Sequence, residues 1–358
     1  MRWSRLAPAV IAGLALASCS AGPPAAPSGA QVSGSATSAA SPIARHTAAA
    51  RRTVPPAGGH PVPGVPLPSP AALIPFGPPA SAGQGAWHPA GRAVGGEPAV
   101  YQITLVPPGG TQPAGIAWMD TGLLSARLYS GSLSTPGGGP YRYTAPIAPA
   151  QARTLVAAFN GGFQMNTARG GYYTERRMIY PLRTGAASLV IYADGTVNIG
   201  AWGRDVTMTP QVISVRQNLT PLVAGARPTR LAATRHWLQE WGDTCSATSC
   251  GQGLPGVEHQ WRTGLGVTAD GALVYVYGPA LDPLQLAQLL VRAGVVRGME
   301  MDINPYWPTF VTYDPPAGAP AAPSNGSKLL ASTVQGPSTF FDPAWDRDFI
   351  TMSARPVR

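Results

Sequence analysis

Two acidic side chains lie two positions apart in a chain that has few acids. The chain has 358 residues with 16 Asp and Glu, and the run Glu300-Met-Asp302-Ile-Asn304 holds two of them. Side chains two apart on a strand share a face, so we expect Glu300, Asp302 and Asn304 to point the same way. Carboxylates buried on an apolar strand are costly unless they are used or paired. The run therefore indicates acid–base chemistry, or else a structural pair bonded to Arg or to backbone N–H groups.

Two other short runs have residue types that suit an anionic ligand. Asn160 precedes Gly161 and Gly162, which let the backbone turn sharply and approach a ligand with exposed N–H groups. A tight turn without a ligand is the alternative. Arg262, followed by Thr263, begins an apolar run and can pair with a phosphate through two parallel hydrogen bonds. A surface salt bridge is the alternative for this Arg.

Aromatic residues follow the acidic run, and motifs for several other chemistries are missing from the sequence. Tyr306 and Trp307 lie close after Asp302. Aromatic faces beside carboxylates suit sugar rings, as they also suit an ordinary core. The chain has no Gly-x-Ser-x-Gly motif and no loop of the calcium-binding type. We therefore expect no metal and no cofactor. From the acidic and aromatic run we expect Asn304 and Trp307 to bind a substrate.

The elements that must position these residues are mostly strands. From Trp87 onward, short apolar runs alternate with Gly-rich turns, and hairpins are expected around Ala193-Asp-Gly195 and Ala269-Asp-Gly271. One helix is expected after Asp282, with Pro283 at its first position and Gly294 at its end. A short helix is expected at 149–154, a long loop at 314–328 and a returning strand within 339–352. This order predicts a sheet-rich α+β single domain with few helices over residues 87–358.

The N-terminal quarter has a different composition. Residues 1–19 have a basic start and a short apolar run that ends Leu-Ala-Ser-Cys19, the pattern of an exported bacterial lipoprotein with a lipid on Cys19. An ordinary secretory signal is the alternative. Residues 20–86 are rich in Ala, Pro, Gly and Ser and lack acids, which predicts a disordered tether. The chain is therefore expected outside the cell, anchored to the membrane and facing outward.

The charge distribution and the cysteine content limit the possible binding partners and the state of the thiols. The net charge is +9, but the basic residues form no dense aromatic-rich cluster, which excludes a nucleic-acid partner. Cys245 and Cys250 could close a small loop, and export favours a structural disulfide over two free thiols. We expect a monomer.

Several of these motifs, in this order, resemble the phosphodiester glycosidase family. The resemblance covers about residues 130–350. It rests on Asn160-Gly-Gly-Phe, Asn218-Leu-Thr-Pro-Leu-Val, Arg262-Thr-Gly-Leu-Gly-Val with the following Asp-Gly turn, the Leu-rich helix, and Met301-Asp302. It implies hydrolysis of a sugar-1-phosphodiester, with site roles for Asn160, Arg262, Thr263 and Asp302. The family's Asn-Leu-Asp-Gly-Gly-Gly-Ser motif is altered here: the Asp is kept, Glu300 replaces the Asn, and bulky residues replace the glycines. Either the substrate differs or catalysis has been lost.

The sequence thus favours a surface-anchored hydrolase that cleaves a glycosyl-1-phosphodiester in a wall or surface glycan. Arg262 would clamp the phosphate with the N–H groups of Gly161 and Gly162, and Asn160 would orient the sugar. Asp302 or Glu300 would act at the anomeric carbon or the leaving group. The alternatives are a noncatalytic lipoprotein that binds a glycan or wall polymer, and a structural lipoprotein without a ligand.

Overall fold

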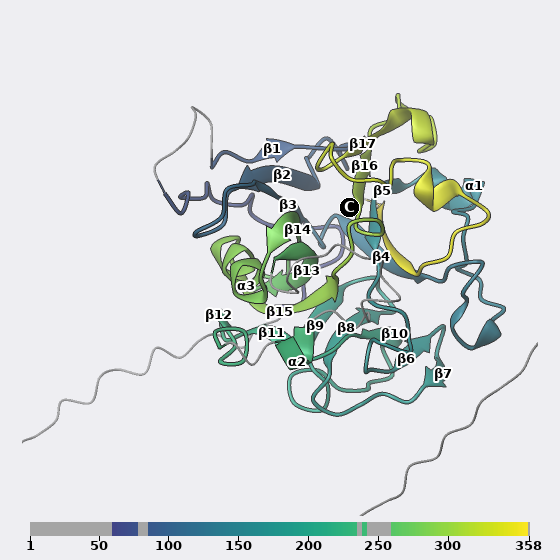
Figure 1. The fold of residues 1–358 in the computed structure, drawn as a ribbon. Coiled ribbons are helices and arrows are strands. Elements are labelled where there is room, and N and C mark those ends of the chain that lie inside the picture. The colour runs from purple at the N-terminus through teal and green to yellow at the C-terminus, as the bar shows by residue number, and fades with distance from the viewer. Residues whose placement is uncertain (1–58, 78–84, 235–237, 242–258, 357–358) are drawn as a thin grey trace, which may run out of the picture. The chain divides into compact units, whose positions relative to one another are not determined.

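Short apolar runs separated by glycine turns form three sheets in the computed structural model (Figure 1). The structure describes residues 59–77, 85–234, 238–241 and 259–356. Within this part of the chain the predicted sheet-rich fold with few helices is confirmed. The predictions for residues 1–19, for Cys19 and for the pair Cys245 and Cys250 lie outside the described residues.

The largest sheet carries the acidic run at one of its central strands. Its eight strands lie in the order β1 (His88–Pro89), β2 (Val100–Leu105), β3 (Ala114–Met119), β14 (Leu273–Leu281), β13 (Gln260–Thr268), β15 (Val295–Asp302), β11 (Pro221–Ala224) and β12 (Arg227–Pro228). β13 pairs antiparallel with both β14 and β15. The expected hairpin around Ala269-Asp-Gly271 is the β13–β14 turn, where Gly271 has a φ of +94°. Such a φ favours glycine over residues with a Cβ.

Two five-stranded sheets complete the strand framework. One has the order β7 (Arg177–Tyr180), β6 (Tyr172–Thr174), β10 (Val212–Gln217), β8 (Ala187–Tyr192) and β9 (Val197–Ala201). The other has the order β17 (Gly326–Lys328), β16 (Phe310–Tyr313), β5 (Leu155–Asn160), β18 (Phe349–Ala354) and β4 (Leu124–Tyr129). β8 and β9 form the expected hairpin around Gly195. β17 forms an edge strand inside the segment predicted to be loop.

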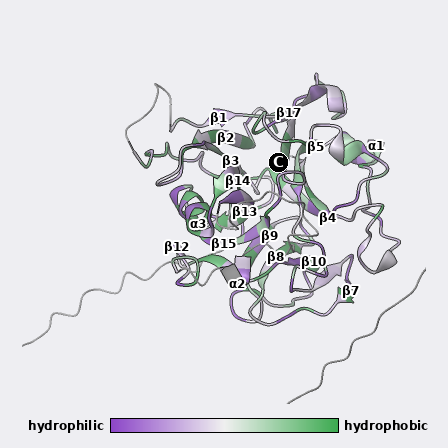
Figure 2. Cartoon of the chain, viewed as in Figure 1, coloured by the Kyte–Doolittle hydropathy of each residue, from purple (hydrophilic) through white to green (hydrophobic). Residues whose placement is uncertain are grey.

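The helices are short, and one of them covers the large sheet. Among the described residues they are α1 (Pro149–Ala152), α2 (Leu238–Trp241) and α3 (Pro283–Arg292), with 3₁₀ turns at Pro136–Gly138, Pro323–Asn325 and Thr339–Phe341. The predicted start of α3 is confirmed, because Asp282 and Gln285 form a reciprocal capping box. The turns of α3 alternate between hydrophilic and hydrophobic colours in Figure 2. Its buried leucines pack against Val274 and Val276 of the sheet.

The main core is apolar and continuous between the sheets. It joins residues of the large sheet, such as Leu265 and Met299, to Phe159 of β5 and Leu189 of β8. The strands that carry these residues bury one face here, and β15 receives a second apolar layer from α3 on its other face. No helix among the described residues is long and apolar enough to cross a membrane.

Residues 59–77 differ from the prediction of a tether up to residue 86. The Leu67 N–H donates to Asp120 Oδ2 at 2.8 Å, and the Gly64 N–H donates to the Gly122 carbonyl at 2.8 Å. Leu73 also packs against the apolar cluster under α3. This segment, which we call the strap, has no sustained hydrophobic periodicity from which its structure could be predicted. Bonds to distant loops order it instead.

Candidate functional site

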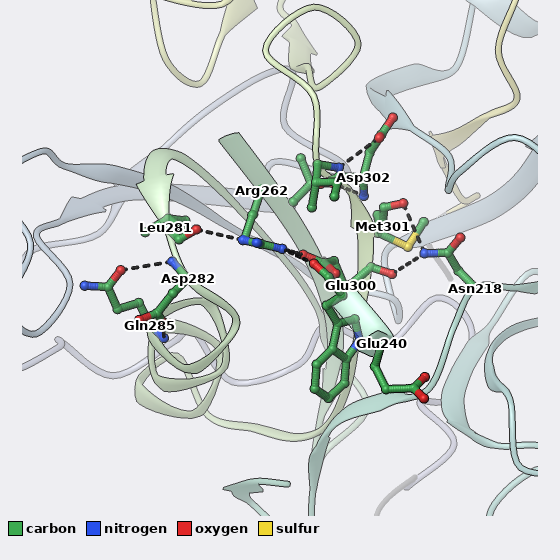
Figure 3. A network of polar contacts seen from close by, with 12 residues as sticks. Asn218, Glu240, Arg262, Leu281, Asp282, Gln285, Glu300, Met301 and Asp302 are labelled. Carbon is green, nitrogen blue, oxygen red and sulfur yellow. Dashed lines mark hydrogen bonds and ion pairs between the residues drawn. The ribbon is translucent and has the colours of Figure 1, made fainter. Parts of the chain in front are cut away.

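A β-bulge near the end of β15 separates the two acidic side chains. Thr263 of β13 pairs with Asp302, whereas the next residue, Gly264, pairs with Glu300. One step along β13 therefore matches two steps along β15, which is the definition of a bulge. Since neighbours on β13 face opposite sides, Glu300 and Asp302 do so as well. In Figure 3 the Glu300 carboxylate points toward Arg262 and the Asp302 carboxyl group points away from it. The expectation of one shared face was wrong, because strand alternation fails across the bulge.

On the α3 side of the sheet, Glu300 and Arg262 form a buried ion pair. Arg262 Nη1 lies 2.7 Å from Glu300 Oε1, and neither side chain has exposed surface. Arg262 also donates from Nε to the Leu281 carbonyl at 2.7 Å and from Nη1 to the Trp241 carbonyl at 2.8 Å. This guanidinium faces protein groups and not solvent, so its geometry fits a structural pair and not the phosphate clamp expected from the sequence.

Burial dominates the protonation of Glu300. It raises the pKa of this carboxyl group to about 7, and the charge and hydrogen bond of Arg262 oppose the rise. Glu300 Oε2 is buried and has no hydrogen-bond partner among the described residues. Glu300 is therefore enclosed by protein and has no exposed side-chain surface.

On the opposite face, Asp302 lies among hydrogen-bonding groups from several strands. Its N–H donates to Thr263 Oγ1 at 2.8 Å, and its Oδ1 accepts the Ile303 N–H at 2.8 Å. Burial raises the pKa of Asp302 to about 7; the charge of Arg347, the Ile303 N–H and the charge of Arg216 lower it, and Asp348 raises it further. The carboxyl group is thus within electrostatic reach of two arginines and exchanges its proton near neutral pH.

Asn160 belongs to the same face and connects the strands beneath Asp302. Its Nδ2 donates to the Gly161 carbonyl at 2.9 Å and lies 3.5 Å from Thr263 Oγ1. Its Oδ1 accepts from Tyr275 Oη at 2.5 Å and from the Thr309 N–H at 3.3 Å. Because Asn160 is 2% exposed and these bonds occupy its amide, it is placed to hold the backbone and not to contact a sugar.

The two glycines after Asn160 are required by side chains that pack on the loop. A Cβ at Gly161 would lie 2.6 Å from Asp348 Cγ, and one at Gly162 would lie 2.8 Å from Asn218 Oδ1. The Gly161 N–H donates to the Asp348 carbonyl at 2.8 Å. The Gly161 N–H therefore bonds within the protein. It does not serve as the donor to a ligand that the sequence led us to expect.

A polar pocket of about 330 Å³ opens beside this loop. Its walls include Phe163, Gln164, Tyr180, Arg216, Arg347 and Asp348. Arg216 is 1% exposed and donates from Nε to Asp348 Oδ2 at 2.6 Å. It also donates from Nη1 to the Gln217 carbonyl at 2.6 Å and from Nη2 to the Phe163 carbonyl. These bonds fix one guanidinium firmly at the pocket wall. We call this cavity the Arg216 pocket.

Arg347 is the less constrained cation of the Arg216 pocket. Its nearest carboxylate oxygen belongs to Asp346, 3.9 Å from Nε, and Nε has no hydrogen-bond partner among the described residues. Its guanidinium carbon lies 4.6 Å from the centre of the Trp307 ring, within the range of a cation–π contact. Arg347 is thus held by an aromatic face and keeps donors for another partner.

The aromatic residues after the acidic run continue from Arg347. Trp307 packs edge-on against Trp345 at 5.4 Å and against Tyr306 at 4.8 Å. Asn304 Oδ1 accepts the Tyr306 N–H at 2.7 Å, and Tyr306 is half exposed. Trp307 therefore lies against Arg347 at the wall of the Arg216 pocket, while Asn304 shapes the turn that carries Tyr306.

Sequence reasoning missed Arg216, Asn218, Arg347 and Asp348 as site residues. Asn218 Nδ2 donates to the carbonyls of Glu300 at 2.7 Å and Met301 at 3.2 Å, and its Oδ1 accepts the Phe163 N–H at 3.0 Å. It therefore ties the bulge to the glycine loop. Arg216 gave one signal, a charge within the apolar strand β10. Arg347 and Asp348 lie in a short charged segment of the kind common on protein surfaces, so the sequence carried no signal that they belong to a site.

The described residues contain no group of three or more His, Cys, Asp or Glu that could hold a metal ion. Cys19, Cys245 and Cys250 lie outside these residues. The groups gathered at this site are the Asp302 carboxyl group, the carboxylates of Asp346 and Asp348, the guanidinium groups of Arg216 and Arg347, and the neighbouring aromatic rings.

Comparisons of the whole chain give distant matches only. No known protein family and no curated protein matches the sequence. Among solved structures, the zebrafish N-acetylglucosamine-1-phosphodiester alpha-N-acetylglucosaminidase catalytic domain, auto-inhibited by its pro-peptide, is 16% identical with a TM-score of 0.42. That match covers 75% of this chain and 88% of the other. A hypothetical protein from Synechocystis is 10% identical (TM-score 0.35, 75% and 64% covered), and a putative exported protein from Burkholderia pseudomallei is 13% identical (TM-score 0.35, 68% and 75% covered).

Proposed function

We propose that this chain is an exported hydrolase that cleaves a glycosyl-1-phosphodiester in a wall or surface glycan, with the phosphate bound in the Arg216 pocket. The observation that carries the proposal is a buried carboxyl group, Asp302, within electrostatic reach of the two arginines of that pocket. Arg347 has hydrogen-bond capacity left for an oxyanion. Arginines suit phosphate because their planar donors match its oxygens.

The reaction assigns separate tasks to the two kinds of group. Arg347, with Arg216 behind it, would neutralise the charge that gathers on the phosphate as it leaves. Asp302 would take a proton from a water molecule while the water oxygen bonds to the anomeric carbon. The bond from that carbon to the phosphate oxygen breaks, and its electron pair stays on the phosphate. A base with a pKa near the working pH is well matched to this step.

The Trp307 and Tyr306 rings would form the platform for the sugar. Trp307 lies against Arg347, so a ring stacked on the aromatic side would place its phosphate toward the guanidinium. Aromatic side chains beside polar groups suit the apolar faces of sugars. Asn160, Thr263 and Glu300 with Arg262 would act on the backbone and not on the substrate.

A noncatalytic glycan-binding protein is the second candidate, and one observation favours it. Glu300 is committed to Arg262, so the pocket face has one acid of the run and not two. The same arginines beside an aromatic platform can bind an anionic glycan without cleaving it. The two candidates share their ligand and differ in turnover.

Assays of the Asp302→Asn variant distinguish the two candidates. The full chain is incubated with a panel of glycosyl-1-phosphodiesters, and the release of reducing sugar is measured. We expect the variant to lose at least about 100-fold in kcat, the lower range for a general base, while Asp314→Asn, an exposed control, keeps full activity. Binding that persists in wild type and variant without any sugar release would contradict the hydrolase and support the binding protein.

The cellular placement is a proposal of its own. A lipid on Cys19 would hold the protein at the outer face of the cell membrane, where a wall glycan is within reach. Replacing Cys19 with Ala should move the protein from the membrane fraction to the medium. Retention of that variant in washed membranes would rule out the lipid anchor.

A further inference from the structure

A second polar groove lies on the outer face of the strand pair β4 and β18. Ser125 pairs with Ser353 across the two strands, and Arg127 pairs with Thr351. The groove has a volume of about 280 Å³, and Gln151 and Arg355 are also among its walls. It shares no residue with the Arg216 pocket, and it is built from other strands.

The groove is cationic and has no carboxylate among its walls. Its charged residues are Arg127 and Arg355. Arg127 Nη1 donates to the Ala126 carbonyl at 2.8 Å. Burial lowers the pKa of Arg355, the charge of Asp194 opposes this, and Arg127 lowers it further. Asp194 and Asp120 are the acids whose charge reaches Arg355, and neither lines the groove, so positive charge is in excess there.

Two buried polar atoms of its wall residues, one a donor and one an acceptor, have no hydrogen-bond partner among the described residues. Arg355 Nε donates to the Leu124 carbonyl at 2.8 Å and to the Thr121 carbonyl at 3.2 Å, and Nη1 donates to the Asp194 carbonyl. Arg355 Nη2 is buried without an acceptor, and Gln151 Oε1 is buried without a donor, among the described residues. Buried polar atoms are nearly always bonded. A ligand that satisfied both would bring an acceptor for Nη2 and a donor for Oε1.

We infer that this groove binds a hydroxylated anion of monosaccharide size, such as a sugar phosphate or a sugar acid. The anionic group would accept from Arg127 and Arg355, and ligand hydroxyls would bond to Gln151, Thr351 and the serine pair. Charge-assisted bonds of this kind are the strong ones in polar recognition. The inference concerns a second site and does not depend on the hydrolase proposed above.

Calorimetric titration of the full chain with glucose 1-phosphate, inorganic phosphate and glucose tests the site. We expect glucose 1-phosphate to bind at least tenfold more tightly than either of the others, because only it carries both the anion and the hydroxyls. Arg127→Gln should weaken this binding at least tenfold, and Thr351→Val should weaken it less. Arg204→Gln, an exposed arginine paired with Asp205, is the matched control and should bind as wild type does.

Binding at the Arg216 pocket is separated from this site by a second variant. Arg347→Gln removes a cation of that pocket and leaves the groove intact, so Arg347→Gln should weaken binding at the Arg216 pocket and Arg127→Gln should weaken binding at the groove. If Arg347→Gln changes nothing, the proposed function loses its phosphate site while the groove inference stands. Unchanged affinity in both Arg127→Gln and Thr351→Val, or equal affinity for glucose and glucose 1-phosphate, overturns the groove inference. Should Arg127→Gln unfold, Thr351→Val alone decides.

Discussion

Each face of β15 carries one acidic side chain, and the surroundings of the two side chains differ. On the α3 face, Glu300 is locked to Arg262 with no exposed surface on either side chain. On the other face, Asp302 has bonds to backbone and hydroxyl groups and lies near the Arg216 pocket, whose arginine charges lower its pKa. Closeness in sequence therefore does not give two carboxyl groups the same role. What decides the role is the partner that the fold supplies on each face.

Breaking the ion pair on the α3 face should have the largest effect on stability. Arg262→Ala leaves a buried carboxylate without its partner, and such changes cost about 3–5 kcal/mol. The free energy of unfolding is measured by urea denaturation. Arg204→Ala, which removes an exposed pair, should cost no more than about 1 kcal/mol. Similar losses in both variants would show that the Arg262 pair is not the structural element described here.

The glycine loop on the Asp302 face should give the next largest effect. Gly161→Ala places a methyl group against Asp348, and overpacking of this kind costs about 1–3 kcal/mol. Because Asp348 holds Arg216, ligand binding at the Arg216 pocket should weaken as well. Gly185→Ala is a poor control because of its positive φ, whereas Gly336, with open space around it, is a suitable one. Equal stability of the Gly161 and Gly336 variants would contradict the packing argument.

Removing the charge of Asp302 should have an effect of opposite sign. Its folded pKa is raised from 3.8 to about 7, so the folded state retains a proton that the unfolded state loses. Stability from this group is thus fully present below pH 4 and is lost as pH rises through 7. Asp302→Asn should flatten this part of the pH–stability curve and stabilise the protein at pH 8. If the variant loses as much stability between pH 5 and pH 8 as the wild type does, the pKa assigned to Asp302 is contradicted.

The smallest effect should come from the strap that packs beside α3. Arg292 of α3 lies 4.1 Å from the centre of the Phe76 ring, and exposed cation–π contacts contribute about 0.5–1 kcal/mol. Phe76→Leu should lower the free energy of unfolding by about that amount and leave activity unchanged. A double-mutant cycle with Arg292→Gln isolates the contact. An activity loss in Phe76→Leu would mean that the strap reaches the Asp302 face.

Local signals in the sequence were enough for the elements but not for the site. Pro283 and the Asp282 cap predict α3 because capping acts within one turn, and glycines at 195 and 271 predict hairpins because they act within one turn too. The bulge at Asp302 depends on pairing between β13 and β15, which no local pattern records. Arg347 and Asp348 reach the site through the packing of β18 and its approach loop, so their charge gave no warning of their position.

The bulge has a consequence for how the two acids exchange protons. The charge of Asp302 raises the pKa of Glu300, although it is the smallest of the influences on that carboxyl group. Because the bulge turns the two carboxyl groups to opposite faces of the sheet, they cannot share a proton through a direct hydrogen bond, as the members of a carboxylate dyad do. Two acids that are neighbours in the sequence thus influence each other through space without forming one proton-sharing unit.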